Sequence, residues 1–112
     1  MKITGWEKKG EMWFNHQPGT TTSIVIWHLS KRIQKPYQFT VIARYDYIVS
    51  PTQQVIHLPD AGFFNIHIKK GHEVMFGKWY STKEEAENAA IVYMKKHPKG
   101  LEPSMALRGT GL

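Results

Sequence analysis

Histidine is the residue type in this chain with the broadest chemistry, because its imidazole ring can ligate a metal ion or transfer a proton near neutral pH. The chain has six histidines and no cysteine. His57, His67 and His72 are separated by ten and five residues, and no two histidines stand four residues apart, as two metal ligands on one helix face would. We therefore expect no metal ion and no other cofactor.

One histidine could still serve in acid–base chemistry if the chain folds back near it. In the hairpin that we expect for this region, His67 lies beside Glu73 and Lys69. Its imidazole could then act as a general base at a phosphodiester while the lysine stabilises negative charge. The motifs of P-loop, dinucleotide-binding, nucleophile-elbow and zinc-protease enzymes are absent from the sequence. We assign no catalytic residue and expect a protein that is not an enzyme, with a small histidine-dependent phosphodiesterase as the enzymatic alternative.

The basic residues indicate a different chemistry, the binding of an anionic polymer. Fifteen lysines and arginines against nine acidic residues give a formal net charge of +6, which favours nucleic acid as a partner. Clusters at strand ends can reach phosphates without burying charge, and each neutralised phosphate adds counterion-release free energy. The basic residues form three clusters: Lys31, Arg32 and Lys35 in a loop, Lys69 and Lys70 at a turn, and Lys95, Lys96 and Lys99 at a helix end.

Aromatic side chains would add stacking surfaces for unpaired bases, each worth about 1–3 kcal/mol. Trp13, Phe63 and Trp79 fall on the polar faces of expected strands. Arg44 shares such a face with Asp46, with which we expect an ion pair, and it is a further candidate phosphate contact. The predicted nucleic-acid-binding residues are therefore Lys31, Arg32, Lys35, Arg44, His67, Lys69, Lys70 and Trp79.

Alternation of apolar and polar residues predicts the strands that carry these side chains. Residues 37–49 alternate with a period of two, and their odd positions should face the core. Segments 11–15 and 20–29 are expected to be the preceding strands, and the loop 30–36 should close an antiparallel hairpin. Residues 54–58 could form a short edge strand, because the flanking prolines argue against a central one.

A second hairpin should begin at Phe63 and turn through a glycine-containing loop of three residues. A loop of this length pairs Lys69 with Glu73 and sets apolar side chains opposite each other on one face. On the other face, the same register places Phe63 beside Trp79.

The last predicted element is a helix over residues 82–97. The run Ser81-Thr82-Lys83-Glu84 fits a capping box, and Pro98 and Gly100 stop the helix. Acidic residues fill its first turns and basic residues its last, which suits the helix dipole. A stripe at three- and four-residue steps can pack on a sheet: Ala86, Ala89, Ala90, Tyr93, Met94 and His97.

The run from Gly77 to Ala90 passes from an aromatic strand end through Ser81-Thr82-Lys83-Glu84-Glu85-Ala86 into this helix. It resembles the last strand and helix of the small AP2-like, arm-type DNA-binding domain of phage integrases. In that family, the helix packs on a three-stranded sheet. The resemblance is confined to this run, and it implies DNA contact from the sheet face opposite the helix.

The order of the elements predicts an α+β fold, a mainly antiparallel twisted sheet of four to six strands with one C-terminal helix packed on one face. The domain should span residues 1–98, with a tail over 99–112 that contains glycine and proline. A chain of 112 residues can hold one core without disulfides or metals. We find neither a signal peptide nor an apolar run of membrane-spanning length, so we expect a cytoplasmic protein with no membrane partner.

These observations predict a small, basic, non-enzymatic nucleic-acid-binding protein that a phage or another mobile element encodes, with DNA ahead of RNA as its partner. The alternative is a protein-binding inhibitor or adaptor that acts on a host or defence protein through the sheet face that the helix leaves open. Salt dependence separates the two, because nucleic-acid affinity falls steeply between about 50 and 200 mM salt.

Overall fold

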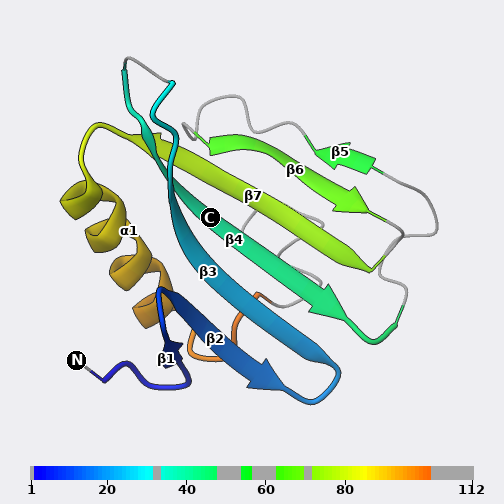
Figure 1. The fold of residues 1–112 in the computed structure, drawn as a ribbon. Helices are drawn as coiled ribbons and strands as arrows, with labels where there is room; N and C mark the ends of the chain where they lie inside the picture. Colours follow the sequence, from blue (N-terminus) through cyan, green and yellow to red (C-terminus); the bar gives the residue numbers. More distant parts are fainter. Residues whose placement is uncertain (1, 32–33, 48–53, 57–62, 70–71, 102–112) are drawn as a thin grey trace.

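A computed structural model describes residues 2–31, 34–47, 54–56, 63–69 and 72–101 of the chain. Its main element is one antiparallel sheet with the strand order β1-β2-β3-β4-β7-β6-β5, and helix α1 packs on one side of it (Figure 1). The elements are β1 (Glu7–Lys9), β2 (Met12–Gln17), β3 (Thr20–His28), β4 (Tyr37–Tyr45), β5 (Gln54–Ile56), β6 (Phe63–Lys69), β7 (Glu73–Tyr80) and α1 (Lys83–Lys96). The α+β arrangement is confirmed: five strands have six or more residues, and the three-residue strands β1 and β5 form the two edges.

Strand β4 divides the sheet into two faces. Its odd positions from Phe39 to Tyr45 are buried, as the period-two pattern predicts. Val41 pairs with Ile24 of β3 and with Phe76 of β7, so buried side chains from three strands form one layer. The even positions of β4 line the opposite face.

Helix α1 covers the buried layer through contacts with β3, β4 and β7. Its buried residues are Ala86, Ala90, Tyr93 and Met94, which confirms the expected seam. The alanines allow close approach, while the Tyr93 ring meets Phe39 and Phe76 edge-on at centroid distances of 5.8 and 6.1 Å.

The helix begins one residue later than the expected capping box. Thr82 and not Ser81 is the N-cap, because the Thr82 hydroxyl accepts a hydrogen bond from the Glu85 amide at 3.1 Å. The same hydroxyl donates to the Glu85 carboxylate at 3.1 Å, so the two side chains are also joined directly. Glu84 and Glu85 then both lie in the first turn, where the helix dipole favours negative charge.

Strand boundaries differ from the expected ones by a few residues. Strand β2 continues to Gln17, because its pairing with β3 extends to the turn. Strand β4 ends at Tyr45; Asp46 then donates its backbone N–H to the Gly19 carbonyl, and residues 48 and 49 lie outside the described chain. The edge strand expected within 54–58 is present as β5.

The β6–β7 hairpin has the expected pairing of Lys69 with Glu73 near its turn. Further along, the register shifts between Phe64 and His67, as one extra residue on β6 would produce. The backbone of Phe63 consequently pairs with Lys78, so the expected register, with Phe63 opposite Trp79, is wrong at this end of the hairpin.

The segment after α1 closes the core. Leu101 is 1% exposed, and its N–H donates to the Thr22 hydroxyl at 3.0 Å. Its carbonyl accepts a hydrogen bond of 2.6 Å from the Tyr45 hydroxyl. Packing therefore continues to Leu101, beyond the end at residue 98 that we expected for the domain.

Two further side chains hold this segment against the sheet. The Trp6 indole donates to the His97 carbonyl at 2.8 Å, and the Asn15 amide donates to the Pro98 carbonyl at 2.9 Å. Gly100 has φ 71°, and an added Cβ would lie 2.5 Å from a buried threonine hydroxyl. The close passage of the backbone therefore requires glycine at this position.

The Tyr93 hydroxyl is buried and has no hydrogen-bond partner within the described chain. Burial, followed by the nearby Tyr45, raises the pKa of Tyr93, so that its phenol stays protonated at neutral pH. A buried, unsatisfied hydroxyl costs about 1–3 kcal/mol of stability. By contrast, the hydroxyl of Tyr45 is hydrogen-bonded to the Leu101 carbonyl.

Ala90→Glu should destabilise the protein by several kcal/mol, because it places a carboxylate in the packed seam, where Ala90 is 2% exposed. Val92→Glu is the matched control on the same helix, since Val92 is 52% exposed, and it should change stability by less than about 0.5 kcal/mol. Urea unfolding followed by circular dichroism measures both. Equal stabilities of the two variants would show that the wrong helix face has been assigned to the core.

Tyr93→Phe and Tyr45→Phe should change stability in opposite directions. Removing the Tyr93 hydroxyl relieves its desolvation and should stabilise the fold by about 1 kcal/mol, whereas removing the Tyr45 hydroxyl leaves the Leu101 carbonyl unpaired and should cost about 1–2 kcal/mol. Both are measured by denaturant unfolding at pH 7. A destabilised Tyr93→Phe variant would indicate a hydrogen bond that the described chain does not contain.

Candidate nucleic-acid interface

The predicted binding residues divide between the two ends of strand β4. This strand has nine residues, and at about 3.3 Å per residue its ends lie about 26 Å apart. The loop with Lys31 and Lys35 precedes β4, at the end where Trp79 of β7 lies (Figure 1). Arg44 lies at the other end, near the β6–β7 turn, and His67 lies close to that end, opposite Met75.

Of the predicted binding residues, two are not described and a third is described only by its backbone. Arg32 and Lys70 lie outside the described residues. Lys69 is placed by its backbone pairing with Glu73, at the Arg44 end of the sheet. The structure therefore brings together Lys31, Lys35 and Trp79 and separates them from Arg44, His67 and Lys69.

A row of three side chains crosses the sheet beside the Lys31 loop. Gln38 of β4 pairs with Trp27 of β3 on one side and with Trp79 of β7 on the other. Directly paired residues of antiparallel strands point to the same face, so the three side chains share the face opposite α1. Trp27 is 49% exposed, and Trp79 is partly exposed.

Trp27 is exposed because it lies beyond the end of its outer neighbouring strand. The pairing of β2 with β3 runs only from Gln17 to Trp13, which lies opposite Ile24. Strand β3 continues to His28 with β4 on its other side (Figure 1). The outer flank of Trp27 is therefore not covered by β2.

The loop beside this row carries exposed cations. Lys31 and Lys35 are both exposed. The Leu29 N–H donates to the Pro36 carbonyl at 2.8 Å, so the two stems of the loop are held together. Lys35 has φ 51°, an uncommon left-handed conformation for a residue other than glycine.

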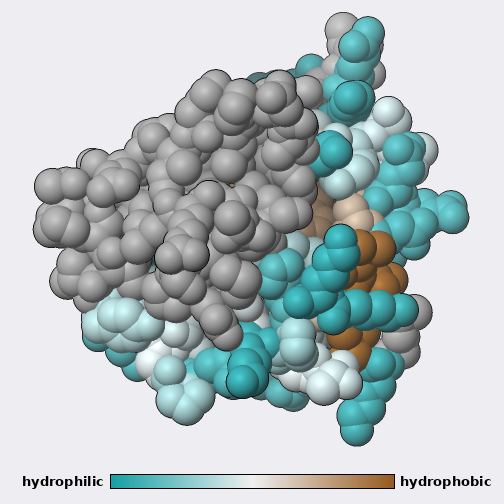
Figure 2. Space-filling view, turned by 180° about the vertical axis from the view of Figure 1, so that it is seen from behind, coloured by the Kyte–Doolittle hydropathy of each residue, from teal (hydrophilic) through white to brown (hydrophobic). Residues whose placement is uncertain are grey.

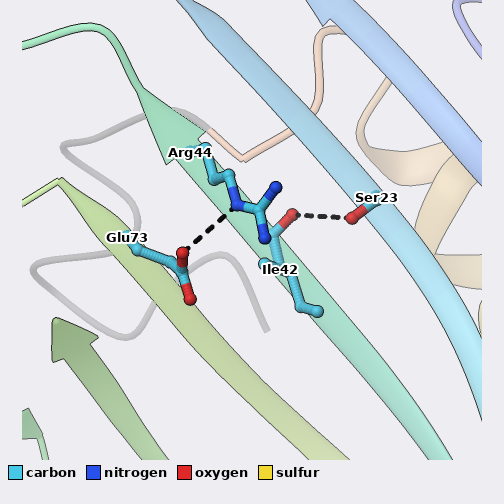
Figure 3. A network of polar contacts seen from close by, with 4 residues as sticks. All are labelled: Ser23, Ile42, Arg44 and Glu73. Atoms are coloured by element: carbon cyan, nitrogen blue, oxygen red, sulfur yellow. Dashed lines mark hydrogen bonds and ion pairs between the residues drawn. The ribbon is translucent and has the colours of Figure 1, made fainter.

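At the other end of the sheet, the charge of Arg44 is balanced. Its Nε donates to the Glu73 carboxylate at 3.2 Å across the β4–β7 pair (Figure 3). Nearby, the Ser23 hydroxyl donates to the Ile42 carbonyl at 3.4 Å. We expected Arg44 to pair with Asp46; the ion pair forms instead with Glu73, which the register places directly opposite.

Glu73, the carboxylate of the histidine centre that we considered as an enzymatic alternative, contacts Arg44 in the structure. Glu73 accepts a hydrogen bond from Arg44, while His67 pairs with Met75. Within the described residues, no group of three or more histidines and acidic residues could hold a metal ion. The described side chains at this end therefore form a structural ion pair on a strand surface.

The expectation for Trp13 is wrong. Trp13 pairs with Ile24 on the helix side of the sheet and packs against the core. The Lys8 ammonium lies 5.8 Å from its ring centroid. Met12, Trp13 and Phe14 are consecutive apolar residues, so alternation does not decide which face of β2 is buried. In the structure, the face that we expected to be polar packs against the core through Trp13.

The helix side has a recess of about 290 Å³ at the border between α1 and the sheet. Its walls include Phe39 and Tyr80 from the sheet and Val92 and Lys96 from the helix. Figure 2 shows hydrophobic residues exposed among hydrophilic ones on this side of the molecule. Partial burial, followed by the nearby Glu85 carboxylate, raises the pKa of Tyr80, so its phenol stays neutral at physiological pH.

Trp27 was missed at the sequence level. Segment 20–29 contains Ile24, Val25, Ile26 and Trp27 in succession, so its apolar residues fall on both faces and alternation does not select one. The clearer alternation of β4 identifies the face of Trp27 only when the pairing of β3 with β4 is known. That pairing begins with His28 opposite Tyr37, across an eight-residue loop.

Comparison of the chain with protein-family models, with curated proteins and with solved structures finds no match in any of the three. In the part of the chain that is described, no helix has the length and apolar character needed to cross a membrane.

Trp27→Phe should reduce the quenching of tryptophan fluorescence by acrylamide more than any other single Trp→Phe change, because Trp27 is 49% exposed. Trp13→Phe is the control, since Trp13 packs against the core, and it should reduce quenching less. Stern–Volmer plots for the two variants and the unmodified protein test this. A larger decrease in quenching for Trp13→Phe would contradict this assignment, because it would mean that acrylamide reaches the Trp13 ring more easily than the Trp27 ring.

Proposed function

We propose that this protein binds nucleic acid through the end of the sheet face opposite α1 that carries Trp27, Lys31, Lys35, Gln38 and Trp79, here called the loop-end surface. The observation that supports the proposal best is the pairing of Gln38 with two tryptophans beside an exposed cationic loop. Aromatic rings next to cations supply stacking for bases and charge for phosphates. The net charge of +6 favours the approach of a polyanion.

Acidic residues on the helix support the same choice of face. Glu84 and Glu85 lie exposed in the first turn of α1, whereas the Glu87 carboxylate forms an ion pair with Lys83 at 4.0 Å. The carboxylates of Glu84 and Glu85 repel phosphate from the helix N-terminus, although the dipole there would otherwise attract an anion. The loop-end surface lies on the other side of the sheet.

The resemblance of residues 77–90 to the arm-type domain of phage integrases favours DNA over RNA as the partner. In that family, DNA contact comes from the sheet face opposite the helix, which is the face of Trp79. On the same ground, we propose that a phage or another mobile element encodes the protein.

Replacing Lys31 and Lys35 together by alanine should weaken nucleic-acid binding at least tenfold, or about 1.4 kcal/mol. The slope of log affinity against log salt concentration should fall by about one to two units, because two phosphate contacts are lost. Fluorescence anisotropy with labelled single- and double-stranded DNA and RNA oligonucleotides measures both quantities. Thermal stability should hardly change, since both side chains are exposed.

The matched control is Lys95→Ala with Lys96→Ala, which removes the same charge from the far end of the helix. It should change affinity by less than about threefold, the effect of net charge alone. Equal losses for the two double variants would overturn the assignment to the loop-end surface. Failure of the unmodified protein to bind any of the oligonucleotides would overturn the function itself and favour the alternative, a partner protein docked on this sheet face.

A further inference from the structure

We infer that the nucleic acid bound by the loop-end surface is single-stranded, with separate bases stacked on Trp27 and Trp79 and a base edge hydrogen-bonded to Gln38. This inference rests on the proposed function and specifies the ligand of the same surface. It is carried by the spacing of the two tryptophans, the polarity of the residue between them and the need of each ring for an unpaired base.

The distance between Trp27 and Trp79 favours one base on each ring. Trp27 and Trp79 lie on strands that flank β4, so two strand spacings of about 4.8 Å separate their backbones by about 9.6 Å. A single base held between two rings would need them about 6.8 Å apart, twice the stacking distance of about 3.4 Å. The wider spacing suits two bases of one strand, each on its own ring.

The residue between the rings presents a hydrogen-bond donor. The Thr40 hydroxyl donates to Gln38 Oε1 at 2.6 Å, and Thr40 is 2% exposed, so this contact holds the acceptor end of the Gln38 amide. The Nε2 group is then the end that can donate to a ligand. Base carbonyls and ring nitrogens on the Watson–Crick edge accept such a bond, and they are available when the base is unpaired.

The exposure of two rings on one face favours unpaired bases over a duplex. The row of Trp27, Gln38 and Trp79 spans three adjacent strands, and a ring can stack on a base only when that base is not stacked inside a duplex. A duplex could reach Lys31 and Lys35 with its phosphates, but its bases would remain stacked on one another and away from the rings. A single strand can place phosphates and bases on the surface at the same time.

The test compares a labelled oligothymidine, which does not pair with itself, with a mixed-sequence DNA duplex of the same length at equal salt. The unmodified protein should bind the oligothymidine at least tenfold more tightly and should lose tryptophan fluorescence on binding. Trp27→Leu should weaken oligothymidine binding at least tenfold, within the range known for a stacked base. The same variant should leave duplex binding within about twofold, because leucine removes stacking and leaves the charge unchanged.

Two control variants and a melting curve make the outcomes distinguishable. Trp13→Phe, on the other face, should leave both affinities unchanged, and the Lys31→Ala, Lys35→Ala variant should weaken the binding of both ligands. Trp27 is half exposed, so Trp27→Leu should retain the melting temperature of the unmodified protein. Equal or tighter binding of the duplex, or an equal loss for both ligands in Trp27→Leu, would overturn this inference and leave the proposed function standing. Absence of binding to either ligand would instead remove the proposed function.

Discussion

The burial of two polar side chains, Asn15 and Thr22, determines how this chain closes over its sheet. Both are 1% exposed among apolar residues, where an unsatisfied polar group costs about 1–3 kcal/mol. Their partners come from far along the chain, since Pro98 accepts from Asn15 and Leu101 donates to Thr22. The segment after the helix must therefore lie across β2 and β3, and this holds α1 against the same side of the sheet.

The two faces of the sheet differ in how far they are covered. Buried apolar side chains from β3, β4 and β7 fill the helix side beneath α1. On the opposite side, Val25 and Thr40 are also buried, whereas Trp27 at the end of β3 is exposed. Trp27 is exposed because β3 extends beyond the end of β2, so the difference in length between two neighbouring strands produces the main aromatic surface.

The sequence predicted the fold well where one physical signal acted alone. The alternation of β4 and the seam of Ala86 and Ala90 on α1 are confirmed, because each follows one period. Prediction failed where several arrangements satisfied the pattern equally. The shift between Phe64 and His67 moved Phe63 away from Trp79, and the pairing of Arg44 with Glu73 depended on a contact between distant strands. The loop-end surface shares this difficulty, because it exists only when β3, β4 and β7 lie side by side in one register.

Net charge alone does not locate a binding surface, and the placement of the acidic residues is the reason that we propose the loop end. Arg44 is cationic and exposed, but Glu73 balances it, so a phosphate there would have to displace a carboxylate. Glu84 and Glu85 lie in the first turn of α1, which begins three residues after β7 ends, and this puts negative charge on the helix side of the same sheet end that carries Lys31. A polyanion approaching this end is repelled on the helix side and attracted on the other, so the charges direct it toward the face of Trp27 and Trp79. Cations in the loop and carboxylates at the helix start thus favour the same orientation of a polyanion in the complex that we propose, and the effect should weaken as salt screens both.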